Sequence, residues 1–220
     1  MDSLFHILSQ FRHLDTTLND WAGRLGPWTY GLLFLIIFVE TGLVVMPLLP
    51  GDSLLFAVGA LAATDHAVLD IWKVGVVMFT AAVLGDAVNY AIGWWVGPKV
   101  FSRKDSWLLN TQHLNRTHAF YEKHGGKTVI VARFMPIVRT FAPFVAGIGR
   151  MAYSRFAAFN VVGGFLWVTG FLALGYEFGN VPFVKKNFEL VMVAIVIISV
   201  MPPLIEWWRA RKAPPTPPVA

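Results

Sequence analysis

Three apolar runs dominate this sequence, and each is close to the roughly 20 residues that a helix needs to cross a bilayer. They extend from Trp72 to Gly97, from Ala152 to Phe178 and from Phe188 to Ile205. Hydrophobic residues make up 56% of the 220 residues and charged residues only 14%, so a soluble monomer could not bury so much apolar surface. We therefore expect an all-α polytopic membrane protein in which these three runs are ordinary transmembrane helices.

The two ends of the chain differ in composition from the region between them. Residues 1–26 alternate apolar with polar side chains at roughly helical spacing, which predicts an amphipathic helix lying in the membrane interface. Residues 209–220 form a basic, Pro-rich tail. We expect residues 27–208 to form the transmembrane domain.

The apolar segment at residues 28–63 does not fit a simple membrane span. A continuous helix of this length would be about 54 Å long, more than a bilayer requires, yet the segment is short for two full crossings and a turn. Pro47, Pro50 and Gly51 are expected to break the helix. Asp52 followed by Ser53 is typical of the start of a second, short helix. This pattern predicts a re-entrant hairpin.

A second hairpin is predicted at residues 128–149. This segment has nearly the length of one span, but it contains Arg133, Pro136, Arg139 and Pro143. A lipid-facing helix should not carry these residues, because non-helical backbone at membrane depth persists only where protein or a water-filled cavity covers it. We read Pro136 and Pro143 as the breakers of this hairpin.

The distribution of Lys and Arg predicts the topology. The loop at residues 98–127 and the tail at 209–220 are rich in basic residues and should be cytoplasmic, whereas the connection at 64–71 carries only acidic charges. Lys185 and Lys186, in the other predicted outer loop, argue mildly against this scheme. The two hairpins would then enter the membrane from opposite sides, as in inverted-repeat transporters.

Four charges lie within the predicted hairpins: Glu40, Asp52, Arg133 and Arg139. Each would cost about 2.5 to 3.5 kcal/mol at the centre of a membrane helix, so we expect the two acids and two bases to pair across a cavity. Two alternatives stay open at this point. Asp52 could serve as a helix cap, and the arginines could extend to the cytoplasmic surface.

Asp86 is a further carboxylate, near the middle of the first long apolar run. The sequence offers it no evident basic partner, so we interpret it as a candidate proton carrier. Asn89 lies three residues further on and shares its helix face. A hydrogen bond between helices is the alternative role for Asp86.

The two arginines suggest an anion site. A guanidinium group grips phosphate through two parallel N–H donors, and the start of the helix at Asp52 and Ser53 adds free backbone N–H groups. We therefore predict that Arg133, Arg139, Asp52 and Ser53 bind the phosphate of a lipid head group, while Glu40, Asp52 and Asp86 serve proton coupling or charge pairing. The lipid tail would stay in the bilayer.

Other residue types point to no further chemistry. The chain has no cysteine, and its six histidines lie outside the apolar runs in no recognisable metal motif, so no metal or cofactor is expected. The net charge of +5 comes from basic residues beside apolar segments and not from a continuous basic stripe, so a nucleic-acid partner is not expected. Apolar helix faces leave a homo-oligomer open.

Four segments carry a family resemblance. They are Phe38–Gly42, Pro47–Asp52, Ala132–Pro143 and Ala146–Gly147. Together they resemble the DedA family, the bacterial branch of the SNARE-associated Golgi protein or VTT-domain group. The resemblance covers roughly Leu25–Glu206.

The resemblance implies a multi-pass protein of the bacterial inner membrane with two opposed re-entrant hairpins. It also implies dependence on proton motive force and transport of undecaprenyl phosphate or phospholipids. The essential acidic pair of the family corresponds to Glu40 and Asp52, and its essential arginine pair to Arg133 and Arg139. The role of Asp86 is not taken from the family.

Our first hypothesis is therefore a flippase that recycles the undecaprenyl phosphate carrier lipid, and not an enzyme. A membrane lipid phosphatase would also need arginines near phosphate, but it would need a His nucleophile, and the sequence has no His near Arg133 or Arg139. A phospholipid scramblase and a proton-coupled small-ion transporter remain as alternatives.

Overall fold

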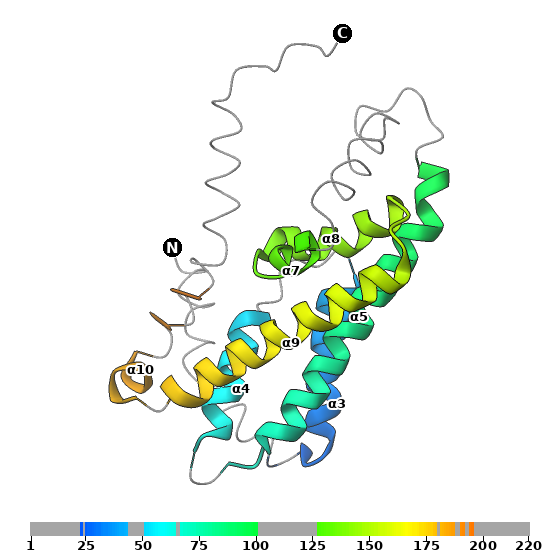
Figure 1. Cartoon of the computed structure of the whole chain (residues 1–220). Helices are drawn as coiled ribbons and strands as arrows, with labels where there is room; N and C mark the ends of the chain where they lie inside the picture. Colours follow the sequence, from blue (N-terminus) through cyan, green and yellow to red (C-terminus); the bar gives the residue numbers. More distant parts are fainter. Residues whose placement is uncertain are drawn as a thin grey trace, which may run out of the picture.

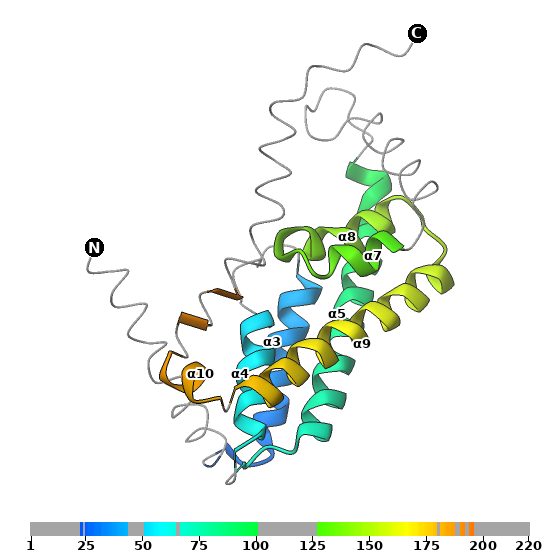
Figure 2. The same ribbon diagram turned by 60° about the vertical axis from the view of Figure 1, so that its left-hand side comes forward.

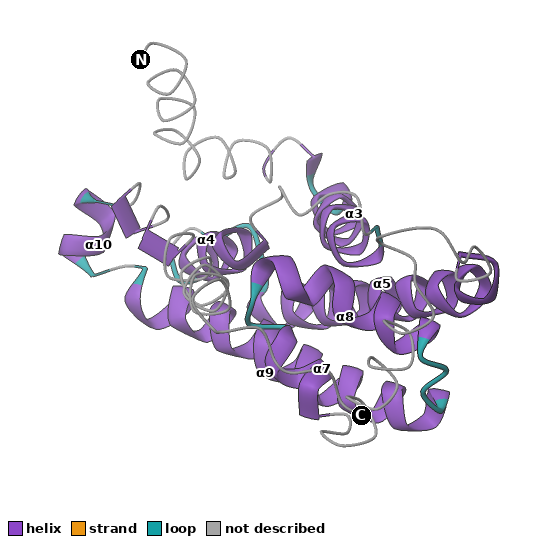
Figure 3. Ribbon diagram, turned by 90° about the horizontal axis from the view of Figure 1, so that it is seen from above, coloured by secondary structure: helices purple, strands orange, loops and turns teal. Residues whose placement is uncertain are grey.

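The structure is a computed structural model, and it describes residues 23, 25–43, 51–64, 67–100, 127–179, 181–187, 190–191 and 194–195. Every secondary-structure element in these residues is a helix (Figure 3). The helices are α3 (Trp28–Gly42), α4 (Gly51–Ala62), α5 (Ile71–Val100), α7 (Lys127–Ala132), α8 (Pro136–Ile148), α9 (Tyr153–Phe178) and α10 (Pro182–Lys186). The predicted all-α class is confirmed for this part of the chain.

Two of these helices, α5 and α9, are long and apolar enough to cross a membrane. Their candidate spans are Ile71–Val96 and Tyr153–Phe178, each of 26 residues, with mean hydropathies of 1.6 and 1.8. They match two of the three predicted spans closely. The third predicted span, Phe188–Ile205, lies almost entirely outside the described residues, as do the amphipathic helix at residues 1–26 and the tail at 209–220.

Much of the surface of the long helices is apolar. On α9, Val162, Phe165, Leu166 and Leu174 are all exposed, and only a third of each candidate span is buried within the protein. A helix that is apolar on both its buried and its exposed faces is typical of a lipid-exposed membrane span.

The α5 and α8 helices pack against one another (Figure 1), and a pair of glycines lies at their contact. A Cβ atom on Gly93 would collide with the carbonyl oxygen of Phe144, and one on Gly147 would collide with the carbonyl oxygen of Tyr90. Only residues without a side chain let the two backbones come this close.

The α4 and α9 helices cross in the same manner. A Cβ atom on Gly59 would collide with the carbonyl oxygen of Leu172, and one on Gly175 would collide with the carbonyl oxygen of Phe56. Gly59 lies three residues after Phe56, and Gly175 lies three residues after Leu172. The crossing of α5 and α8 has the same spacing, because its two glycines also lie three residues after the carbonyls that are approached on their own helices. Thus α4, the second helix of the pair α3–α4, packs on α9, the long helix that follows the pair α7–α8. In the same way α8 packs on α5, the long helix that follows α3–α4 (Figure 2).

The predictions for the prolines of the two hairpins differ in how they compare with the structure. Pro136 occupies the first turn of α8, directly after the break from α7, as predicted. The prediction that Pro143 breaks the hairpin is wrong, because α8 continues through it to Ile148. Pro47 and Pro50 lie outside the described residues, and Gly51 is the first residue of α4.

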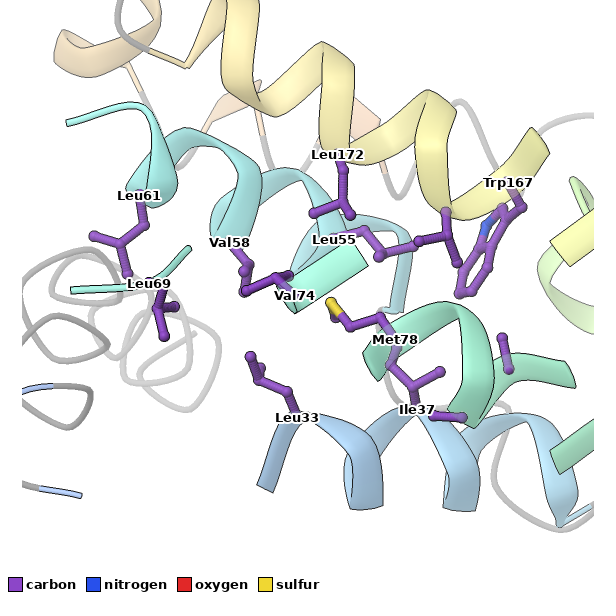
Figure 4. Close-up of a cluster of buried hydrophobic side chains, with 13 residues drawn as sticks. Leu33, Ile37, Leu55, Val58, Leu61, Leu69, Val74, Met78, Trp167 and Leu172 are labelled. Atoms are coloured by element: carbon purple, nitrogen blue, oxygen red, sulfur yellow. The ribbon is translucent and has the colours of Figure 1, made fainter. Parts of the chain in front are cut away.

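One apolar core joins the two halves of the chain. Nearly all of its buried side chains come from α3, α4, α5 and α9, including Ile37, Leu55, Met78, Trp167 and Leu172, and Leu69 adds to it from the connection before α5. Figure 4 shows Leu55 and Leu172 facing one another, with Trp167 at one edge of the cluster. The polar site begins at this edge, because Trp167 also contacts charged groups.

Candidate functional site

Five ionisable side chains are buried together among these helices. Glu40 comes from α3, Asp52 from α4, Asp86 from α5, Arg133 from the turn between α7 and α8, and Arg139 from α8. None is more than 7% exposed. Burial at this level makes unpaired charges very costly, so their contacts decide what the site can do.

Arg139 links the first pair of helices to α8. Its Nη1 donates a hydrogen bond of 2.6 Å to Oδ1 of Asp52, and its Nη2 donates to Oε1 of Glu40. The same Glu40 oxygen accepts a hydrogen bond of 3.0 Å from the backbone N–H of Gly51. The predicted pairing of the two hairpin acids with an arginine is therefore present.

Gly51 leaves room for the Glu40 carboxylate in this arrangement. A Cβ atom at this position would collide with the Glu40 carboxylate. The absence of a side chain lets the start of α4 approach the end of α3, where the carboxylate receives the Gly51 N–H. This close approach adds to the role of helix breaker that the sequence suggests for Gly51.

Asp52 lies inside the first turn of α4, because the helix begins one residue before it. Its Oδ1 accepts hydrogen bonds from Arg139 and, at 2.7 Å, from Nε1 of Trp167. The carboxylate therefore joins α8 and α9 to α4. This binding role replaces the alternative in which Asp52 only precedes and caps the helix.

Arg133 forms a second ionic group with Asp86. Its Nη1 donates a hydrogen bond of 2.7 Å to Oδ2 of Asp86 and another of 2.7 Å to Oδ1 of Asn160. The prediction that Asp86 lacks a basic partner is wrong, because the turn after α7 folds back onto α5 and α9. The alternative that the arginines extend to the surface is also wrong, since both are buried.

Asn89, and not Asp86 alone, makes hydrogen bonds between helices, the alternative role for Asp86. Its Nδ2 donates to the backbone oxygen of Thr41 at 3.1 Å and to that of Thr140 at 2.7 Å. Asn89 is fully buried, and these bonds connect α5 to α3 and α8. One face of α5 therefore supplies an ion pair through Asp86 and a structural bridge through Asn89.

Sequence reasoning missed Trp167 and Asn160. The Trp167 ring centroid lies 5.6 Å from Cζ of Arg133 and 5.1 Å from Cζ of Arg139, within the range of cation–π contact. A tryptophan in the middle of a span, away from the interfaces, was an available signal. So was Asn160, an amide within an apolar run.

Several buried polar atoms have no hydrogen-bond partner among the described residues. Those of the charged side chains and of Ser53 are Nε and Nη2 of Arg133, Nε of Arg139, Oγ of Ser53 and Oε2 of Glu40. Four of these five atoms are donors. Ser53 lies buried at the start of α4, with its hydroxyl available to a further acceptor, and its predicted role in phosphate binding stays a prediction.

The charges of the cluster do not balance. With all five groups ionised, the three carboxylates (Glu40, Asp52 and Asp86) and the two guanidiniums (Arg133 and Arg139) sum to −1. Uptake of one proton by a carboxylate would bring the sum to zero. A buried cluster of this kind can hold an anion through its free donors and exchange a proton at the same place.

Comparison with known proteins finds one family model and several membrane-protein relatives. Residues 49–177 match the model of the VTT domain. The chain is 50% identical to Protein DedA of Escherichia coli (strain K12) over 213 residues, which cover 97% of each chain. It is 42% identical over 196 residues to an uncharacterized membrane protein of Mycobacterium leprae (strain TN), covering 88% of this chain and 87% of that protein.

The name of a more distant relative specifies the inner membrane. The chain is 34% identical over 188 residues to Inner membrane protein YghB of Escherichia coli (strain K12), covering 83% of this chain and 84% of that protein. No solved structure matches the chain. Asp52, Asp86 and both arginines fall inside the matched VTT domain, whereas Glu40 precedes it.

Proposed function

This chain belongs to the DedA family of VTT-domain membrane proteins, and from this premise we propose that it is a flippase for a lipid phosphate. The proposed cargo is undecaprenyl phosphate or a related lipid, moved between leaflets of the bacterial inner membrane for carrier-lipid recycling. No covalent step is part of this proposal. The protein would bind the head group, carry it past the midplane and release it.

The observation that carries the proposal is a pair of buried arginines with free donors. Arg133 and Arg139 together keep three N–H-bearing nitrogens without a partner among the described residues. A guanidinium with free donors in a membrane protein favours an anion that can itself reach the membrane interior. A phosphate on a lipid tail meets this condition.

The charge of the cluster supports a link to protons. Three buried carboxyl groups face two guanidiniums, so binding of one proton removes the net charge of the empty site. Arrival of an anionic head group adds negative charge, which favours protonation of a carboxylate at the same time. Proton and lipid would then cross together, driven by the proton motive force.

The short helices support a re-entrant arrangement. The helices α3, α4, α7 and α8 have 15, 12, 6 and 13 residues, fewer than the roughly 20 that a full crossing needs. The matched glycine crossings of α4 with α9 and α8 with α5 support a repeat of the same unit. We propose that the two units enter from opposite faces, with the C-terminus in the cytoplasm.

The proposal is tested by measuring translocation of a labelled prenyl phosphate in proteoliposomes, with and without an imposed pH gradient. Wild-type protein is compared with Arg133→Ala and Arg139→Ala. We expect gradient-sensitive movement in the wild type and loss of movement in both variants. Correct insertion of the variants is checked by protease accessibility.

Two controls separate the alternatives. A labelled phospholipid without a prenyl chain tests whether the cargo is general, and its equal movement in both directions would indicate a scramblase. Flux of monovalent cations in liposomes without prenyl lipid would indicate a small-ion transporter. Prenyl phosphate movement no faster than in protein-free liposomes would overturn the flippase proposal.

A further inference from the structure

We infer that the two arginines have different tasks, an inference that rests on the proposed function. The Nε and Nη2 edge of Arg133 is the phosphate-binding subsite. Arg139 instead holds α3, α4 and α8 together through their carboxylates. The head group of the lipid would thus be bound beside Asp86 and Asn160, and not between Glu40 and Asp52.

The contacts of Arg139 leave little of it for a ligand. Both terminal nitrogens are already engaged, Nη1 with Asp52 and Nη2 with Glu40. Each of these nitrogens keeps a second N–H, but a phosphate held by two nitrogens of Arg139 would have to lie beside one of these carboxylates or displace it, because at least one of the two nitrogens already donates to a carboxylate. Displacement of Glu40 would also remove the acceptor of the Gly51 N–H, so the joint between α3 and α4 would be lost.

Arg133 has the opposite arrangement. All the described hydrogen bonds of its side chain, to Asp86 and to the side chain and backbone of Asn160, leave from Nη1. Nε and Nη2 are buried and have no partner within the described part of the chain. These two nitrogens form one edge of the guanidinium, whose parallel N–H groups match two oxygens of a phosphate.

The surroundings of Arg133 hold this edge in a fixed orientation. Asp86 on α5 and Asn160 on α9 both accept hydrogen bonds from Nη1, and the Trp167 ring centroid lies 5.6 Å from Cζ. The neighbouring α9 residues are Gly163 and Gly164, and a Cβ on Gly164 would lie 3.5 Å from the same Cζ. The guanidinium is therefore oriented before any anion arrives, which reduces the entropy lost on binding.

Two matched double variants test this division. Asp86→Asn/Arg133→Gln and Glu40→Gln/Arg139→Gln each remove one acid and one base, so the net charge of the cluster is unchanged. Binding is measured on the purified full-length protein in detergent as thermal stabilisation by farnesyl phosphate. Farnesol and inorganic phosphate are the comparison ligands, which separate a lipid head group from free phosphate as the source of the anion.

We expect the first double variant to raise the half-saturating concentration of farnesyl phosphate about tenfold or more, since a charged two-point contact is lost. The second should stay within about threefold of wild type, although its translocation should be lost. Arg133→Lys and Arg139→Lys form a second matched pair in case a double variant does not fold. Lysine keeps the charge but not the fork, so only the change at Arg133 should weaken binding.

Equal losses in both double variants would overturn the division of tasks and leave the flippase proposal standing. Binding of inorganic phosphate alone through Arg133 would keep the subsite but overturn the lipid cargo. Stabilisation by farnesol as strong as by farnesyl phosphate, or none by any of the three ligands, would overturn the subsite. The translocation assay of the wild type decides the flippase proposal independently.

Discussion

Arg133 and Asp86 lie 47 residues apart in the sequence, and their side chains meet at 2.7 Å in the interior of the protein. The contact joins the turn after α7 to the long helix α5. Both groups are buried, so each is compensated mainly by the other.

Removal of both partners should therefore destabilise the protein less than the sum of the two single removals. Asp86→Asn and Arg133→Gln should each lower the free energy of unfolding by about 3 to 5 kcal/mol, because each leaves a buried charge without its partner. The double variant should be more stable than the sum of the two predicts, with a coupling of about 0.5 to 3 kcal/mol. Thermal unfolding in detergent measures this cycle, and strictly additive losses would contradict the ion pair.

The glycine crossing of α4 and α9 predicts a difference between two substitutions on one helix. Gly175→Ala places a Cβ against the Phe56 carbonyl and should destabilise the protein by about 1 to 3 kcal/mol. Gly170→Ala is the control, since a Cβ there meets no atom within 4 Å and alanine favours the helix by up to about 1 kcal/mol. Equal unfolding temperatures for the two variants would show that the backbones are not in close contact.

Trp167 should matter through its N–H as well as its ring. Trp167→Phe keeps an aromatic ring near both arginines but removes the donor to Asp52. Loss of a hydrogen bond to a charged group, about 1.5 to 3 kcal/mol, predicts a fall of roughly tenfold or more in the initial rate of prenyl phosphate translocation. Trp72→Phe is the matched control, because the Trp72 side chain is 83% exposed. A rate for Trp167→Phe equal to that of this control would remove Trp167 from the site.

Glu40→Gln should uncouple transport from the pH gradient. Glutamine imitates the protonated acid, so the cluster changes from −1 to neutral, and its Oε1 can still accept from Arg139 and Gly51. We expect translocation by this variant to proceed at the same rate with and without an imposed gradient.

Asp70→Asn is the control for that experiment. Asp70 lies outside the cluster, where its Oδ1 accepts from the backbone N–H groups of Trp72 and Lys73 at the start of α5. Asparagine can accept the same bonds, so gradient sensitivity should persist. Gradient-dependent acceleration in Glu40→Gln would assign the proton to another carboxylate of the cluster.

Part of the site was open to prediction because charge in an apolar run is conspicuous. Glu40, Asp52, Arg133 and Arg139 all had to be buried and paired, since each is costly within a membrane. The break before Pro136 followed from the geometry of proline. Pro143 was misread because proline in the interior of α8 is tolerated where neighbouring helices cover the backbone.

The sequence by itself determined that this chain is a helical membrane protein, where its two described long helices run, and which charged residues need partners. These properties depend on composition and on local order along the chain. Only the tertiary structure decided which arginine meets which acid, and that Trp167 and Asn160 join them. Partner choice depends on how helices distant in the sequence cross, and the backbone contacts at Gly93 and Gly175 set those crossings.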